Sequence, residues 1–449
     1  MRKSIKTILG GAILVALPML LTSCEGTLDD VFGEWSRPTP GNNTNTNTTP
    51  TADHSNQYLV YSYSTALDSV WTNIEGATVW TGTVAPGNVA AGTYVVEGTA
   101  TCAGQLVLMG EVNLILKDGA KLTVDDGIHY DTTGDAGSLN IYGQGISSSM
   151  GQLIVNNNTP YGLGTTEASA LVVKALSIHG GKIDATADTG ATPADTGGDG
   201  LEVPSGAGDL IIYNGLVTAT AKKFRTGIAL WGTGKINIHG GEIFAYSPGG
   251  QGIAAQNAGN GTLNITGGKV TAKDTNVGKA PGEGIDCDII NITGGIVIAA
   301  NAGGGNPAIN AYVSLSIDGS ETQVTATGGN GADGDMSYYD GIFGSIGIKA
   351  PTIQIDGGTV IATGGNGGNG YTASGFWGNG GDGGDGISCT DIAVDASASV
   401  TATGGNGGNV LNGSGKNVGA AGKGLKTVNP ATGSGTIAAT DGTAGTDSL

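Results

Sequence analysis

Acidic residues recur at glycine-rich turns of this 449-residue chain, where they could bind a divalent cation. Calcium takes about six to eight oxygens from carboxylates and main-chain carbonyls. Turns such as Asp333-Gly334-Asp335 offer both kinds of oxygen. No EF-hand loop or strict calcium-binding nonapeptide is present, so solvated surface acids remain the alternative. The candidate calcium ligands are Asp199, Glu283, Asp286, Asp333, Asp335, Asp340, Asp382 and Asp385.

Aromatic residues make up 5% of the chain, yet two glycine-rich segments each carry several of them. Aromatic rings pack on the C–H faces of sugars and leave the polar sugar edges in water. These residues are therefore candidates for carbohydrate binding, and the alternative is that they attach long loops to the rest of the protein. The set is Tyr338, Tyr339, Tyr371, Phe376 and Trp377.

No catalytic residue can be assigned from the sequence. CxxC, HExxH, GxSxG and nucleotide-binding glycine motifs are missing in the required context. His179 and His239 share a repeat position two turns apart, at roughly 10 Å, which is too far for one zinc ion. A polysaccharide lyase would need a basic residue, and the best enzymatic candidates are Lys222, Lys223 and Arg225.

A repeated phrase predicts the scaffold that positions these residues. The segment 179–185 reads HGGKIDA and recurs with variation at 239–245, 266–272, 293–299 and 356–362. Val270, Val297 and Val324 lie 27 residues apart, a spacing typical of stacked repeats. Alternating apolar residues indicate short strands, and the paired glycines suit tight corners with positive φ. We therefore predict an all-β, right-handed parallel β-helix of about ten turns.

The rest of the chain divides by composition. Residues 1–23 have a basic start and an apolar run, typical of an export signal, and Leu21 to Cys24 resemble a bacterial lipobox with Cys24 as the lipidated residue. We expect a signal peptide at 1–23, a flexible tether at 24–52, an N-terminal β cap at 53–91, the β-helix at 92–430 and a C-terminal tail at 431–449. The formal net charge of −19 argues against nucleic acid as a partner.

The regular spacing fails at one corner of the repeat. After Ala326, Ala362 and Ala402 the connection grows to about twenty residues, and each insertion begins Thr-Gly-Gly-Asn-Gly. Because the insertions follow the same strand in adjacent turns, they should form one continuous surface, where repeat proteins often bind partners.

Several short motifs resemble the bacterial β-helix carbohydrate-binding domains that bind cellulose or polygalacturonate. The resemblance rests on 198–201 (GDGL), 282–287 (GEGIDC), 290–295 (INITGG) and 384–388 (GDGIS), and it extends over residues 92–426. It implies calcium at acidic corners and sugar binding without cleavage. Thr226, Gln251 and Ile346 depart from the pattern, because they stand where the family has an acid.

Three functions are compatible with the sequence. The first is a monomeric lipoprotein, anchored to the bacterial outer membrane and facing outward, that binds an extracellular polysaccharide with help from calcium. The second is a polysaccharide lyase or hydrolase on the same fold, since fold alone does not decide activity. The third is an adhesive or structural surface rod.

Overall fold

The computed structural model describes residues 54–133, 137–145, 149–157, 169–187, 197–222, 224–277, 281–373, 376–410 and 415–447. The chain divides into two compact units, Met1–Thr48 and Thr49–Leu449, and every described residue belongs to the second. The expected signal peptide, the lipidation site Cys24 and the tether lie outside the described residues. Those that are described form strands and turns only, so none of them belongs to a helix that could cross a membrane.

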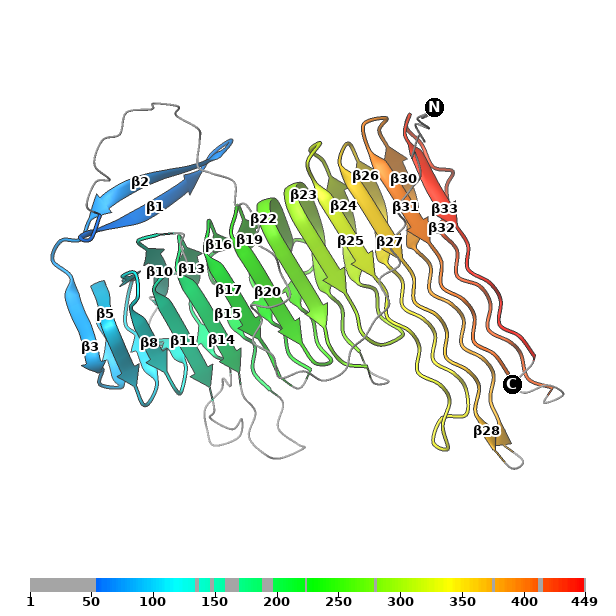
Figure 1. Ribbon diagram of the computed structural model, residues 1–449, viewed down its shortest axis with the longest axis horizontal. Helices are drawn as coiled ribbons and strands as arrows, with labels where there is room; N and C mark the ends of the chain where they lie inside the picture. Colours follow the sequence, from blue (N-terminus) through cyan, green and yellow to red (C-terminus); the bar gives the residue numbers. More distant parts are fainter. Residues whose placement is uncertain are drawn as a thin grey trace, which may run out of the picture. The chain divides into compact units, whose positions relative to one another are not determined.

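Most strands belong to three parallel stacks, in which each strand pairs with its counterpart one repeat later (Figure 1). The first stack consists of β4 (Gly87–Val89), β6 (Leu106–Leu108), β9 (Ile128–Tyr130), β12 (Leu171–Val172), β15 (Leu201–Val203), β18 (Ile228–Leu230), β21 (Ile253–Ala255), the starts of β23 (Ile285–Ala300), β24 (Ile309–Ile317), β26 (Ile348–Ile355) and β30 (Ile387–Val394), and β32 (Leu425–Thr427).

The second stack consists of the start of β5 (Gly92–Cys102), β7 (Val112–Leu116), β10 (Ser138–Gly143), β13 (Ala175–Ile178), β16 (Leu210–Ile212), β19 (Lys235–Ile238), the start of β22 (Thr262–Asp274), and later parts of β23, β24, β26 and β30. The third stack consists of the end of β5, β8 (Lys121–Val124), β11 (Gln152–Asn157), β14 (Lys182–Ala187), β17 (Leu216–Thr220), β20 (Glu242–Ser247), the ends of β22 and β23, β25 (Gln323–Thr327), β27 (Thr359–Thr363), β31 (Ser399–Thr403) and β33 (Thr436–Thr440).

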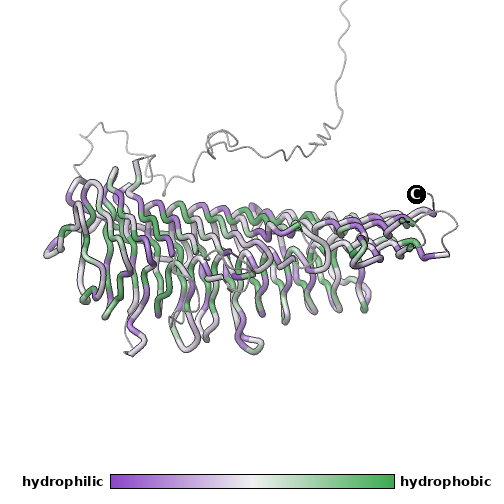
Figure 2. Tube along the Cα trace, turned by 90° about the horizontal axis from the view of Figure 1, so that it is seen from below, coloured by the Kyte–Doolittle hydropathy of each residue, from purple (hydrophilic) through white to green (hydrophobic). Residues whose placement is uncertain are grey.

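Alternating side chains build the core between the stacks. Leu263, Ile290, Leu315, Ile353 and Ile392 occupy one register position on successive strands, and each is at most 2% exposed. Burying such ladders is the main favourable contribution to folding. Figure 2 shows the apolar stretches recurring from turn to turn. The predicted all-β class with stacked parallel strands is confirmed.

The corners between the second and third stacks contain the glycine pairs of the repeated phrase. The second glycine of each pair has a φ between +79° and +91°, a region that favours glycine. These residues are Gly181, Gly241, Gly268, Gly295 and Gly358. Each complete repeat holds three strand segments, one in each stack.

The segment predicted as an N-terminal cap divides in two. β3 (Thr78–Thr83) and β4 pair in parallel with β5 and β6, so they start the stacks before residue 92. β1 (Gln57–Tyr63) and β2 (Leu67–Asn73) form an antiparallel hairpin that packs beside the stacks rather than over their end (Figure 1). The Tyr61 N–H donates to His179 Nδ1 at 3.0 Å, and Tyr63 stacks on His239 at 4.0 Å.

Candidate functional site

The three insertions fold into one ordered body, which we call the glycine bundle. It has four outgoing segments (328–335, 364–371, 404–410 and 441–447) and three returning segments (338–347, 378–386 and 417–424). In Figure 1 these segments leave the third stack near its C-terminal end and reach β28 (Thr372–Ala373) at the tip. Residues 441–447, predicted as part of a tail, supply the fourth outgoing segment.

Main-chain hydrogen bonds hold the glycine bundle together with a repeat of three residues. In the first outgoing segment, Gly331 and Gly334 donate their N–H groups to carbonyls of the second outgoing segment, and Gly328 donates to Thr363 just before it, at 2.7–2.8 Å. Other N–H groups link the two layers, as from Gly365 to Ser345 at 2.8 Å. A three-residue repeat is that of polyproline II backbone, which makes no hydrogen bonds within its own segment. The main-chain N–H and C=O groups of each segment are therefore paired with those of neighbouring segments.

Glycine is needed here because the segments touch. A Cβ added to Gly365 would lie 1.8 Å from the Gly329 carbonyl oxygen, and one added to Gly368 would lie 2.0 Å from that of Ala332. None of the described glycines in these segments has a φ in the left-handed range. These glycines are required because they have no side chain, whereas the corner glycines of the stacks are required because their φ is positive.

The third residue of each triplet lies on the outer surface. Two amide rows cross the outgoing segments: Asn330, Asn366 and Asn406, and then Asp333, Asn369 and Asn409. In both rows the Oδ1 atom accepts the N–H of the next member at 2.7–2.9 Å. Thr443 and Thr446 end the rows by donating to Asn406 and Asn409. These asparagines are not among the site residues predicted from the sequence, although they recur there every third residue.

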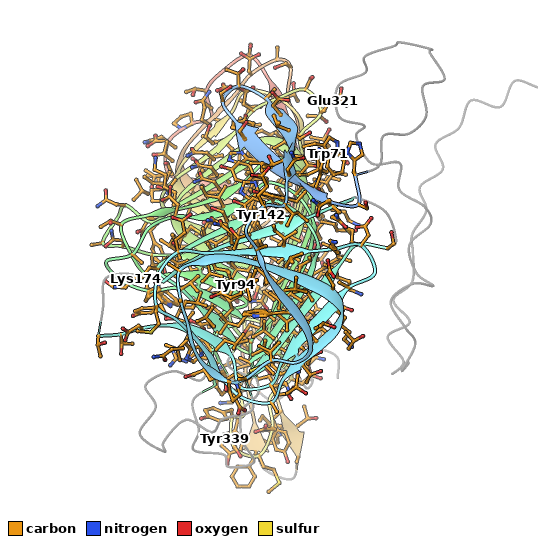
Figure 3. The ribbon with its side chains drawn as sticks, turned by 90° about the vertical axis from the view of Figure 1, so that its left-hand side faces the viewer. Trp71, Tyr94, Tyr142, Lys174, Glu321 and Tyr339 are labelled. Atoms are coloured by element: carbon orange, nitrogen blue, oxygen red, sulfur yellow. The ribbon has the colours of Figure 1, made fainter. Side chains whose placement is uncertain are left out.

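The predicted aromatic residues gather at the tip of the bundle, and Figure 3 shows Tyr339 there, at the end away from the stacks. The Tyr339 ring lies 5.4 Å from Phe376 and 6.0 Å from Tyr371. Phe376 and Trp377 form β29, which pairs with β28 in a short antiparallel hairpin. Tyr338 is 64% exposed and Phe376 55%. The structure thus joins aromatic residues from two insertions into one exposed cluster.

The predicted calcium ligands in the bundle lie on different surfaces. Asp333 is on the outgoing layer, whereas Asp340, Asp382 and Asp385 are on the returning layer. Each of the four accepts a main-chain N–H from the following segment at 2.7–2.8 Å. Asp335 accepts the N–H groups of Ser337 and Tyr338 within its own turn. These acids therefore act as acceptors that hold the segments in register.

The other predicted ligands are buried in the turns of the first stack. Asp199 accepts the indole N–H of Trp231 at 3.2 Å, and Asp286 accepts the amide of Asn310 at 2.9 Å. Burial, and then the charge of Asp286, raise the pKa of Glu283 to about 7. No three His, Cys, Asp or Glu residues in the described part of the chain lie close enough to hold a metal ion together.

The basic candidates lie away from the aromatic tip. Arg225 donates through Nε to the Gly197 carbonyl at 2.7 Å, in the turns of the first stack, and Lys223 is outside the described residues. Near the bundle, Lys423 pairs with Asp441 at 2.9 Å and Lys426 pairs with Asp385 at 3.3 Å.

A cavity of about 270 Å³ opens beside the first strands of the stacks, which the sequence analysis did not identify. Its lining includes Trp80 and Tyr94, whose rings are 4.6 Å apart. Both rings also pack against the core, so they close the end of the apolar interior.

The chain was compared with protein-family models, with curated proteins and with solved structures, and none of them matches it.

Proposed function

We propose that the three stacks form a right-handed parallel β-helix. Every strand of a stack pairs in parallel with its counterpart one repeat later, which supports a coil that advances by one strand per turn. The right hand follows from the general preference of crossover connections between parallel strands. The first stack runs from β4 to β32 through twelve strands, somewhat more than the ten turns expected, and its first strand, β4, lies before residue 92.

We propose that the protein binds an extracellular polysaccharide through the aromatic tip of the glycine bundle. The observation that carries this proposal is the exposed cluster around Tyr339, built from two adjacent insertions. Monomeric proteins seldom expose a cluster of large apolar side chains without a binding function. Met336 and Phe343, which belong to the same insertion as Tyr339, are also 78% and 61% exposed.

Binding without cleavage fits the described residues better than catalysis does. A lyase needs a base at the sugar, and a hydrolase needs two carboxyl groups flanking the scissile bond. The best paired acids are Glu283 and Asp286, but they are 8% and 1% exposed and lie in the stacks. The acids beside the tip, Asp335 and Asp340, accept main-chain N–H groups, and the groups that a bound polysaccharide would meet there include the aromatic rings.

Calcium assistance remains a prediction, and the residues present fit it poorly. Asp274 Oδ2 is buried without a hydrogen-bond partner among the described residues, and its charge acts on the nearby Glu283. Asp286 also acts on Glu283, but no three acids of the described residues lie close enough together to hold a metal ion. We therefore assign no part of sugar binding to calcium.

We also propose that lipidation of Cys24 anchors the chain to the bacterial outer membrane, with the bundle facing outward. The support comes from the sequence of residues 1–24. Substituting Cys24→Ser should release the protein from the membrane fraction and abolish incorporation of labelled fatty acid. Continued membrane association of the Ser variant would contradict this anchor.

Binding can be tested with the full-length chain on an array of polysaccharides, with and without EDTA. We expect retention of at least one polysaccharide and no release of unsaturated or shortened products. Product release would favour the enzyme, whereas binding to no polysaccharide would favour an adhesive or structural rod. Loss of binding in EDTA would restore a role for calcium.

A further inference from the structure

The amide rows present a flat array of hydrogen-bond donors. In Asn330, Asn366, Asn406, Asn369 and Asn409 the side-chain atom that accepts the neighbouring N–H must be the oxygen, because an amide NH₂ cannot accept it. The orientation of each amide is therefore fixed by its neighbour.

The nitrogen of each amide is left to interact with something else. No described residue accepts a hydrogen bond from Nδ2 of these five asparagines. Asn330, Asn366 and Asn406 are exposed, and Asn369 and Asn409 are half-buried. In the rows, each asparagine Oδ1 thus accepts a main-chain N–H, which fixes the position of the amide. Each Nδ2 has donor capacity left for a ligand.

The amide rows contain one acid, Asp333, whereas the matching positions of the returning layer carry Asp340, Asp382 and Asp385. Other acids of the outgoing layer lie around the rows: Asp335, Asp441, which pairs with Lys423, and Asp447. These charges disfavour a negatively charged polymer on this layer. An uncharged polymer with many oxygen acceptors is complementary to the rows.

We propose that the amide rows form a second subsite, which selects a neutral polysaccharide that lies across the outgoing segments. The proposal rests on the proposed function, which it extends from the aromatic tip to a defined surface and to a class of glycan. Tip and rows share the same segments, since Asn366 and Asn369 lead directly to Tyr371.

The spacing of the rows suits an extended sugar chain. Outgoing segments continue the strands of the third stack, so neighbouring segments lie roughly 4.8 Å apart. That distance is comparable to the length of one pyranose residue in an extended chain. Each sugar can then meet one amide of a row and accept a hydrogen bond through a hydroxyl or N-acetyl oxygen.

A matched pair of double variants tests the proposal. N366D/N369D keeps each Oδ1 acceptor but replaces the donor NH₂ by a charged oxygen. N379D/N417D makes the same change on the returning layer, where Asn379 accepts the Asn417 N–H at 3.0 Å. The fold already accommodates Asp at positions of both kinds, as Asp333 and Asp340 show. Thermal unfolding shows whether both double variants fold. If N366D/N369D does not fold, the single variant N406D takes its place.

The readout is binding of the full-length chain to cellulose, chitin and β-mannan as neutral probes and to polygalacturonate as an acidic probe. We expect N366D/N369D to weaken binding to the neutral probes about tenfold or more, and N379D/N417D to change it by no more than about twofold.

Equal effects of the two double variants, together with loss of binding in Trp377→Ala, would overturn the amide subsite and leave the aromatic tip in place. Tighter binding of the wild type to polygalacturonate than to any neutral probe would overturn the selection of neutral glycans. Failure of the wild type to bind any polysaccharide would overturn both the subsite and the proposed function.

Discussion

The strand stacks and the glycine bundle are continuous in the chain but are held together by opposite means. In the third stack, Val324, Val360 and Val400 are buried in an apolar core. A few residues further on, the interior of the bundle is glycine, and backbone meets backbone directly. The stacks rely on apolar burial and the bundle on main-chain hydrogen bonds. Regular pairing can thus continue beyond the apolar core when no side chain stands between the segments.

The largest effect is expected from Gly365→Ala in the bundle. The new Cβ would lie 1.8 Å from the Gly329 carbonyl oxygen, and because the atoms nearest to it are all backbone, no side-chain movement can relieve the clash. Overpacking typically costs about 1–3 kcal/mol, and more where the surroundings are rigid. Hydrogen exchange should show loss of protection in 328–347 and 364–386 while β22 stays protected. Met336→Ala is the control, because that side chain belongs to the same insertions and is 78% exposed. Unchanged protection in the bundle would show that glycine is not required there.

Ile353→Ala in the stacks should change less of the structure, because it leaves a cavity in the core and separates no segments. Ile353 is 1% exposed, so its truncation should lower the free energy of unfolding by about 2–5 kcal/mol. Ile361→Ala makes the same change at a position that is 42% exposed and should cost much less. Denaturant unfolding compares the two variants. Similar costs would contradict an apolar core that carries the stability of the stacks.

The docked β1–β2 hairpin should loosen in acid. Burial lowers the pKa of His179 to about 4, whereas an exposed histidine titrates near 6.5. In the undocked state His179 is therefore protonated below about pH 6.5. In the docked state it stays neutral down to about pH 4. Docking is strongest above pH 6.5 and weakens by up to about 1.4 kcal/mol per unit as the pH falls toward 4.

Limited proteolysis of the hairpin at pH 5 and 7.5 measures this loosening. His179→Gln retains an acceptor for the Tyr61 N–H but does not titrate, so its cleavage should not depend on pH beyond that of the protease. Equal resistance of the wild type at both pH values would exclude His179 as the cause.

The smallest effect is expected from Lys423→Ala on the surface of the bundle. The Lys423–Asp441 pair is about half exposed on both sides, and such pairs contribute little. We expect no measurable change in Tm at moderate salt. A clear drop in Tm would mean that the bundle depends on surface charge as well as on its main chain.

The sequence predicts the stacks better than the bundle, for a physical reason. The 27-residue spacing of Val270, Val297 and Val324 reflects a strand period and an apolar face, and both can be read from one chain. The triplets of 364–369 (GGNGGN) do indicate a three-residue backbone repeat. Polyproline II segments make no internal hydrogen bonds, however, so their partners appear only in three dimensions.

The candidate site shows the same limit. Tyr339, Tyr371 and Phe376 come from adjacent insertions, and their rings lie together in the structure. Asp333 and Asp382 were grouped together although the chain reverses between them and puts them on opposite layers. The hydrogen bond from the Tyr61 N–H to His179 joins residues 118 positions apart, and no local sequence pattern predicts it.

The most direct test of the division between a supporting stack and a binding bundle compares two variants of exposed aromatic residues. Tyr338→Ala/Phe376→Ala/Trp377→Ala removes rings at the bundle tip, and Phe224→Ala removes a ring of the stacks that is 64% exposed. Polysaccharide binding by the full-length chain should be lost in the tip variant and retained in Phe224→Ala. Full binding by the tip variant would contradict the account.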